Sequence, residues 1–178
     1  ISAHPVDLRG MISALRLGWY KVHRPLEYYA AYFTVRSDDF DGATAIKGKE
    51  AVFRKMKDLD VKIKNREASP KEEGEFGTLQ IINEMLARGI ALRPVDLYKS
   101  EAKRFVVEDG QIRLPFSSLA GVGESAALSL REARDEGGEY ISIDDVQARA
   151  KVSSAVIDTL REAGSLSGLP ESSQTTLF

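Results

Sequence analysis

Two glycines separated by one apolar residue, just ahead of a helical pattern, constrain this chain more than any other feature. Residues 119–123 read Leu-Ala-Gly-Val-Gly, and a helical pattern follows them as far as Arg134. Glycine adopts positive φ angles at little cost, so such a segment can form a tight bend between two short helices. The first turn of the following helix leaves backbone N–H groups without partners and carries a partial positive charge. The pattern therefore predicts a bend that offers main-chain donors to an anion.

A bend of this kind between two helices is typical of a helix-hairpin-helix, which holds the phosphates of duplex DNA without reading the base sequence. The apolar residues on either side of the bend supply the helix packing that such a motif needs. We predict that DNA is contacted by Leu119, Gly121, Val122, Gly123, Glu124, Ser125 and Lys151. A bare Gly-x-Gly also occurs in ordinary packing turns between helices, and that alternative stays open.

Length and composition limit the class of protein. With 178 residues, of which 43% are hydrophobic, the chain can form one domain or two small ones. It has no cysteine, which excludes disulfides and cysteine-based metal or redox sites. No apolar run reaches the length of a membrane span, so we expect a soluble, cytoplasmic protein with no membrane partner. The net charge of -2 argues against binding nucleic acid through overall charge, so contacts with DNA should be local.

Apolar spacing predicts a mainly α fold with one small β-hairpin. The predicted helices span residues 11–22, 26–35, 43–59, 70–88 and 153–163. Ser69, Pro70 and Glu72 form a strong helix start, and Gly89 is a typical helix end. The pair Asp109-Gly110, between two apolar runs, predicts the turn of the β-hairpin.

The predicted helix over residues 43–59 should face the core with Ile46, Val52, Phe53, Met56 and Leu59. Residues 62–66 should form a polar connection after it. Ser142 should cap a further helix through Asp144 or Asp145.

A change of character near Pro94 divides the chain. Residues 1–94 form a helical unit with several aromatic side chains, and residues 95–168 form a smaller unit around the glycine hairpin. Residues 169–178 form a flexible tail, and the Ser-rich stretch is expected to be mobile from Ser165 onward.

The last five residues, Gln-Thr-Thr-Leu-Phe, are the second candidate binding segment. Leu177 and Phe178 are large apolar side chains near a flexible end, and they gain stability only when a pocket buries them. Gln174 can fix their register through the hydrogen bonds of its amide. A frayed end that docks on its own domain is equally compatible with this composition.

A run of basic residues offers a further candidate surface. Eight Lys and Arg residues lie between Lys47 and Arg66, and Glu50, Asp58 and Asp60 interrupt them. Mixed charges of this kind favour a solvated helix face over a phosphate-binding surface.

Signals for catalysis or metal binding are weak in this sequence. Asp38, Asp39 and Asp41 suit a loop and a helix start better than a metal site. His4 and His23 have no partner at the spacing of metal ligands, and nucleotide-binding loops and nucleophile motifs are absent from the sequence. We therefore predict neither a catalytic nor a metal site.

A family resemblance rests on several segments taken together. They are WYKVHRPLEYYAAYFTVR at 19–36, DFD at 39–41, ASPK at 68–71, VDLY at 95–98, the glycine hairpin, KVS at 151–153 and QTTLF at 174–178. In combination they resemble the C-terminal end of the bacterial family C replicative DNA polymerases, and in particular the PolC type of the DNA polymerase III α subunit. The resemblance covers nearly all of residues 11–178.

The resemblance implies that residues 1–94 are the distal part of a fingers domain and that a duplex-binding domain follows. For the parent enzyme it implies DNA-directed DNA polymerase activity with two Mg²⁺ ions on palm carboxylates. No part of a palm is recognisable here, so the segment alone should neither bind a cofactor nor polymerise. The implied partners are primer–template DNA, the palm and thumb domains and, through Gln174, Leu177 and Phe178, the sliding clamp (β subunit).

Two places depart from the family pattern. Where the family has Lys-Ala-His in a nucleotide-binding stretch, this chain has Ser2-Ala3-His4. The missing lysine and the following Pro5 argue against nucleotide binding by His4. Thr175 and Thr176 differ modestly from the usual Leu-Ser or Leu-Asp pair. Two other hypotheses stay open, namely a stand-alone DNA-binding adaptor recruited by the sliding clamp and a purely structural helical module.

Overall fold

The computed structural model describes the backbone of residues 5–173 and the side chains of residues 13–173. Helices α1 (Pro5–His23) and α2 (Pro25–Val35) come first. The elements that follow are η1 (Ser37–Asp39), α3 (Gly42–Ala45), α4 (Lys49–Lys64), α5 (Pro70–Ala87), β1 (Leu92–Arg93), β2 (Val106–Glu108), β3 (Gln111–Arg113), η2 (Phe116–Ser118), α6 (Glu124–Gly137), α7 (Ile143–Ala150) and α8 (Ser154–Glu162). The prediction of a mainly α fold is confirmed. None of the helices in this described part is long and apolar enough to cross a membrane.

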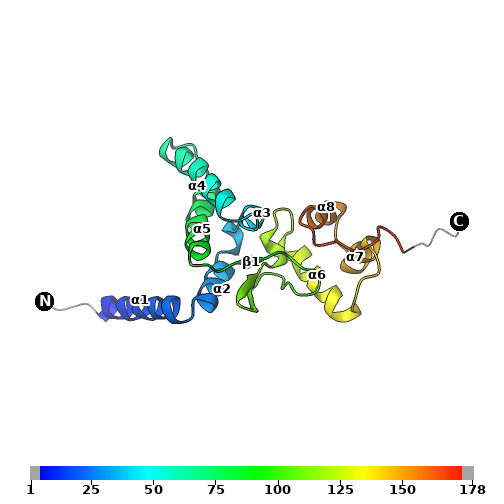
Figure 1. Cartoon of the computed structure of the whole chain (residues 1–178), viewed down its shortest axis with the longest axis horizontal. Helices are drawn as coiled ribbons and strands as arrows, with labels where there is room; N and C mark the ends of the chain where they lie inside the picture. Colours follow the sequence, from blue (N-terminus) through cyan, green and yellow to red (C-terminus); the bar gives the residue numbers. More distant parts are fainter. Residues whose placement is uncertain (1–4, 174–178) are drawn as a thin grey trace.

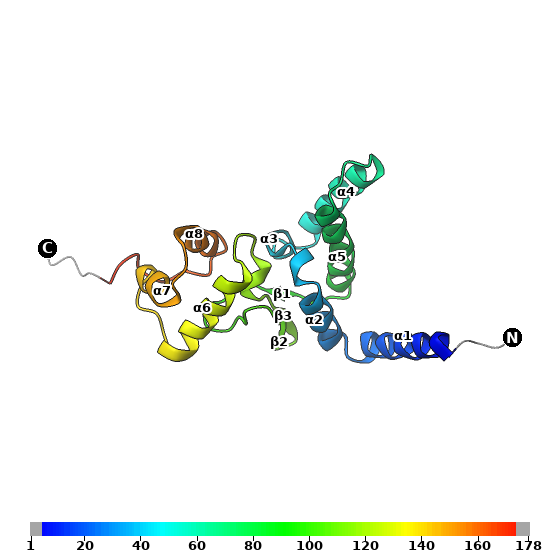
Figure 2. The same ribbon diagram turned by 180° about the vertical axis from the view of Figure 1, so that it is seen from behind.

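The molecule is elongated, with its small sheet near the middle (Figures 1 and 2). Helix α1 extends at one end, and α6, α7 and α8 gather toward the other. Helices α4 and α5 pack against each other as a pair that projects from the body. The central sheet therefore lies between two groups of helices.

Three local sequence signals set element boundaries as predicted. The Ser69 hydroxyl accepts the N–H of Glu72 at 3.1 Å, and the Glu72 carboxylate accepts the N–H of Ser69 at 3.3 Å, which completes a capping box. Helix α5 ends before Gly89, whose φ is 82°, and the Ile90 N–H donates to the Met85 carbonyl. At the start of α7 the Ser142 hydroxyl accepts the N–H of Asp145 at 3.0 Å. These predictions are confirmed.

The sheet has the order β1-β3-β2, with β1 parallel and β2 antiparallel to β3. Asp109 and Gly110 join β2 to β3 with φ angles of 49° and 78°. Positive φ at both central residues is what a two-residue hairpin turn of type I′ requires, so the predicted β-hairpin is confirmed. Strand β1 adds a third strand, in which Leu92 aligns with Ile112.

The prediction of one helix over residues 43–59 is wrong. Gly48 has a φ of 99°, which breaks the helix into α3 and α4. The break turns Ile46 and Phe53 toward solvent, with 39% and 50% of their surfaces exposed, although both were expected in the core. Val52 and Leu59 are buried as expected. Helix α4 then continues to Lys64, so most of the predicted polar connection is helical.

Three phenylalanines connect the chain on both sides of Pro94. Phe105 lies 5.6 Å from Phe33 and 4.7 Å from Phe40, measured between ring centroids. All three side chains are buried, so one hydrophobic core runs from α2 to the segment before β2. Strand β1, which precedes Pro94, also pairs with β3, which follows it. The core is continuous at this point, and the division into two domains stays a prediction.

The prediction that the chain is mobile from Ser165 onward is wrong for residues 165–171. The Ser165 hydroxyl donates to the Val95 carbonyl at 2.8 Å, and Leu166 is buried. The backbone N–H groups of Ile143 and Asp144 donate to carbonyls in this segment, at residues 170 and 171. These hydrogen bonds hold the segment against the start of α7. The last five residues lie outside the described part.

Candidate nucleic-acid interface

The predicted glycine bend forms a tight turn after η2. The Val122 N–H donates to the Leu119 carbonyl at 3.1 Å, and Gly121, the third residue of this turn, has a φ of 93°. A positive φ at that position is characteristic of a type II turn and favours glycine. The side chains of Leu119 and Val122 are buried, whereas Ala120 and Gly121 are exposed. The turn thus anchors itself through two apolar side chains and presents its main chain to solvent.

Helix α6 begins directly after the turn with an open N-terminus. Gly123 is the N-cap residue, with extended φ and ψ of -72° and 171°, and no side chain caps the helix. Within residues 5–173 no acceptor bonds the N–H groups of Glu124, Ser125 and Ala126. Gly123, Glu124 and Ser125 are exposed. Exposed donors at a helix N-terminus suit an anion because the helix dipole adds to their attraction.

A second bend, between α7 and α8, repeats this construction. Lys151 is exposed and left-handed, with φ and ψ of 55° and 43°, and Val152 after it is buried. Ser153 is the N-cap of α8, with φ and ψ of -73° and 162°, close to those of Gly123. Each bend therefore has a left-handed exposed residue, a buried valine and an extended N-cap. Sequence reasoning missed the second bend because its left-handed position, where glycine is the usual signal of such a bend, is occupied by a lysine.

The first bend also packs against α8. A Cβ built on Gly121 would lie 3.2 Å from the Thr159 hydroxyl, so the turn tip is close to the middle of that helix. Thr159 lies on α8, the helix that Ser153 begins. The two bends are thus joined through one helix.

The predicted site residues divide into three groups. Gly121, Gly123, Glu124 and Ser125 form one exposed surface, and Lys151 lies on the second bend. Leu119 and Val122 bury their side chains, which leaves only their main chain for contact. The remaining predicted residues lie outside the described part of the chain: His4, Gln174, Leu177 and Phe178.

Helix α3 supports the first bend from the other side. A Cβ built on Gly42 would lie 2.5 Å from the Ser118 carbonyl oxygen, so the start of α3 touches the backbone just before the turn. Asp41 caps this helix by accepting the N–H and the hydroxyl of Thr44, at 3.1 and 2.6 Å, and it pairs with Lys55. Burial raises the pKa of Asp41, but the hydrogen bonds from Lys55 and Thr44 outweigh it and lower the pKa. Asp41 thus acts as a helix cap.

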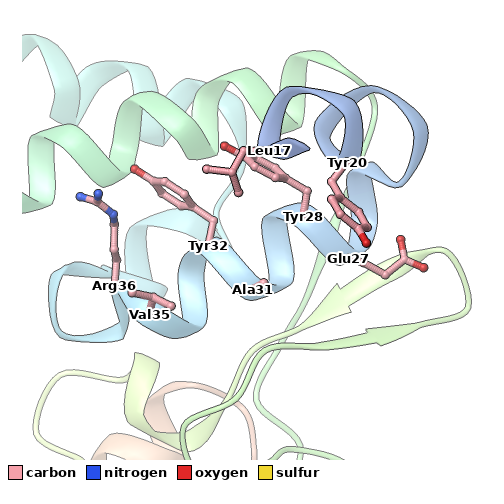
Figure 3. Close-up of a pocket in the computed structure, with 8 residues that line it drawn as sticks. All are labelled: Leu17, Tyr20, Glu27, Tyr28, Ala31, Tyr32, Val35 and Arg36. Carbon is pink, nitrogen blue, oxygen red and sulfur yellow. The ribbon is translucent and has the colours of Figure 1, made fainter. Parts of the chain in front are cut away.

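The structure also contains an apolar groove between α1 and α2 (Figure 3). It encloses about 600 Å³ and is lined mainly by Leu17, Tyr20, Tyr28, Tyr32 and Val35. Among its lining residues the charged groups are one carboxylate and one guanidinium, from residues 27 and 36. The groove is therefore mainly apolar, and its other polar groups are the hydroxyls of its tyrosines. Elsewhere in the described residues, no three His, Asp or Glu side chains gather as a metal site.

Comparison with known proteins agrees with this geometry. Residues 89–176 match a family model described as the helix-hairpin-helix motif. The matched region includes both bends, so this part of the chain is similar to the helix-hairpin-helix motif.

The chain is also similar to larger proteins over nearly its whole length. It is 44% identical to the DNA polymerase III PolC-type of Halalkalibacterium halodurans and 43% identical to that of Bacillus subtilis, each over 94% of this chain. Identity to the DNA polymerase III PolC-type of Thermotoga petrophila is 40% over 99% of the chain. The chain is therefore a relative of a segment of PolC-type DNA polymerase III. It spans only 12% of the length of these three proteins.

Proposed function

We propose that this chain is the C-terminal segment of a bacterial replicative DNA polymerase, in which it holds duplex DNA behind the site of synthesis. The observation that carries the proposal is the first bend, because exposed glycines lead into an uncapped helix start. Its free N–H groups suit a backbone phosphate, and the Ser125 hydroxyl can add a further donor. Similarity to PolC-type DNA polymerase III supports the choice of DNA as the ligand.

The net charge of the chain supports binding of DNA phosphates through main-chain N–H groups. At -2, the chain as a whole does not attract DNA, so a few local contacts must hold it. Each phosphate that a cation neutralises makes binding more sensitive to salt, while neutral N–H donors add little to that sensitivity. We expect weak binding of duplex DNA without sequence preference, and a shallow dependence on salt.

Polymerisation belongs to the parent enzyme in this proposal. Template-directed nucleotidyl transfer would use two Mg²⁺ ions held by palm carboxylates outside this chain. The contribution of this segment is to position the duplex, with the palm and thumb domains as its intramolecular partners. We expect the segment alone to have no polymerase activity.

The C-terminal pentapeptide is proposed to bind the sliding clamp. Gln174, Leu177 and Phe178 suit an apolar pocket that also offers partners to an amide. Changing Leu177→Ala together with Phe178→Ala should abolish capture by immobilised clamp. The fold should be unaffected, because the described core is formed without these residues. Equal capture of the double variant and the unchanged chain would reject this assignment.

The substitution Gly123→Asp tests whether the first bend binds duplex DNA. A Cβ at Gly123 meets nothing within 4 Å, and aspartate is a good N-cap, so the fold should be as stable as before or more stable. The new carboxylate would accept the free N–H groups of α6 and repel a phosphate. We expect binding of a fluorescent duplex, followed by anisotropy, to be lost.

The matched control is Gly18→Asp. Gly18 is also an exposed glycine whose added Cβ would meet nothing within 4 Å, and it lies on α1, so the same exchange adds the same charge away from both bends. It should leave duplex binding unchanged. Retention of duplex affinity by the Gly123→Asp protein would refute the proposed function, and so would the absence of any duplex binding by the unchanged chain.

A further inference from the structure

Charge is distributed very unevenly along this chain. The segment from Lys47 to Arg66, which contains α4 and is called the basic arm below, has eight basic and three acidic residues. Its net charge is thus +5, whereas that of the whole chain is -2. A local excess of this size on an otherwise acidic protein creates a positive field over one part of its surface.

The basic arm is largely open to solvent. Helix α4 buries Val52 and Leu59 and packs against α5 along one side. On its other sides Phe53 and Val61 are 50% and 57% exposed. Figure 1 shows α4 projecting from the body beside α5. A long face of the helix is therefore available to a partner.

Ion pairs engage only some of the cations on the arm. Lys55 pairs with Asp41 and Glu75, and Lys62 pairs with Glu72 at 2.8 Å. Lys64 pairs with an aspartate one turn earlier. Within the described part of the chain, five cations of the arm have no ion pair: Lys47, Lys49, Arg54, Lys57 and Arg66.

Two of these free cations share a stripe with an exposed aromatic ring. Lys49, Phe53 and Lys57 follow one another at intervals of four residues, which places them on one face of α4. The Lys57 ammonium lies 4.6 Å from the centre of the Phe53 ring. Neither lysine makes an ion pair within residues 13–173, so both can neutralise phosphates without breaking an ion pair of the folded chain.

The base of the arm adjoins the first bend. Lys47 lines a hollow of about 460 Å³ together with Ala120 of the turn and Thr159 of α8. Gly42, at the start of α3, touches the backbone of Ser118 just before the turn. The free cations therefore begin beside the exposed main chain of the hairpin.

We propose that the basic arm is a second duplex-binding surface, which contacts the phosphate backbone beyond the stretch held by the first bend. This inference rests on the proposed function. Helix α4 has 16 residues and is about 24 Å long. That length corresponds to roughly seven base pairs of B-DNA. A duplex seated on the bend can thus run along the arm for most of a helical turn.

The test compares duplexes of two lengths. Lys49→Ala combined with Lys57→Ala removes the two stripe cations, both of which are exposed, so thermal unfolding should be unchanged. A duplex of 24 base pairs can reach along the whole arm, whereas one of 8 base pairs, centred on the bend, extends only about four base pairs, or roughly 14 Å, beyond it. We expect the salt slope of log K for the longer duplex to fall by about 1.8, because each lost phosphate contact removes about 0.9. The salt slope for the shorter duplex should fall by less.

The control is Arg16→Ala combined with Arg24→Ala. These two arginines are exposed, make no ion pair in the described structure and belong to α1 and its junction with α2. Helix α1 extends away from α4 (Figure 2). This pair lowers the net charge by the same amount and should leave both duplexes unaffected.

The arm proposal is overturned if the Lys49/Lys57 variant binds the longer duplex with an unchanged slope, or if it weakens both lengths equally. Either result leaves the proposed function intact as long as Gly123→Asp abolishes binding of both duplexes. If the Gly123→Asp protein still binds both duplexes, the proposed function is refuted separately.

Discussion

Lys151 allows the backbone and the charge of the second bend to be tested separately. Its φ of 55° and ψ of 43° place a side chain in the left-handed region, which costs roughly 1–2 kcal/mol for a residue other than glycine. Lys151→Gly removes that strain, while the greater freedom of glycine in the unfolded chain costs about 0.5–1 kcal/mol. The balance predicts a protein more stable by roughly 0.5 kcal/mol. The midpoint of thermal unfolding should therefore rise by about 1–2 °C.

The same change should weaken DNA binding. If Lys151 neutralises one phosphate, its loss lowers the salt slope of log K by about 0.9. At 0.1 M salt this corresponds to about an eightfold loss of duplex affinity. Stability and affinity are thus expected to change in opposite directions, which a general disturbance of the fold would not produce.

Two further variants complete the design. Lys151→Met keeps the strained backbone and an unbranched side chain but removes the charge, so it should lose affinity without gaining stability. Asp109→Gly relaxes a similar left-handed residue, with a φ of 49°, in the turn between β2 and β3. It should leave duplex affinity unchanged. The reasoning is refuted if Lys151→Gly lowers the unfolding temperature, or if both Lys151 variants bind duplex as tightly as the original chain.

Two other predictions concern the scaffold around the bends. A hydrogen bond from Arg113 lowers the pKa of Glu108 from 4.5 to about 2, so its stabilisation is complete above pH 4.5 and is lost as the pH falls toward 2. With allowance for partial solvent exposure, Glu108→Gln should cost roughly 2 kcal/mol at pH 7, and urea unfolding of this variant should vary less between pH 4.5 and 2. Gly42→Ala should destabilise the fold by about 1–3 kcal/mol, because its Cβ would press on the backbone of Ser118. Gly77→Ala, whose Cβ would meet nothing within 4 Å, should cost nothing in the same urea assay.

Much of the fold follows from local signals in the sequence. The capping box at Ser69, the glycine end at Gly89 and the Asp109-Gly110 turn were predictable because neighbouring residues alone determine each of them. The break at Gly48 was not predictable, because apolar spacing continues across it and a single glycine is tolerated within helical patterns. Strand β1 has only two residues, and it exists because β3 is there to pair with it.

The candidate interface was predictable for similar reasons, and only in part. The first bend was predictable from Gly121 and Gly123. Gly121 adopts the positive φ of the turn, and Gly123 is the N-cap of α6 without a capping side chain. The second bend has a lysine in the left-handed position, where sequence statistics favour glycine. The free cations of the basic arm could be recognised only once the ion pairs of their neighbours were known. Sequence spacing cannot supply that information, because partners such as Lys55 and Glu75 lie on different helices.

The ring cluster of Phe33, Phe40 and Phe105 has a mechanical consequence. Close-packed rings do not slide past one another easily, because interiors of this density have low compressibility. A force that displaces the segment before β2 is therefore transmitted directly to α2, because Phe105 packs on both Phe33 and Phe40.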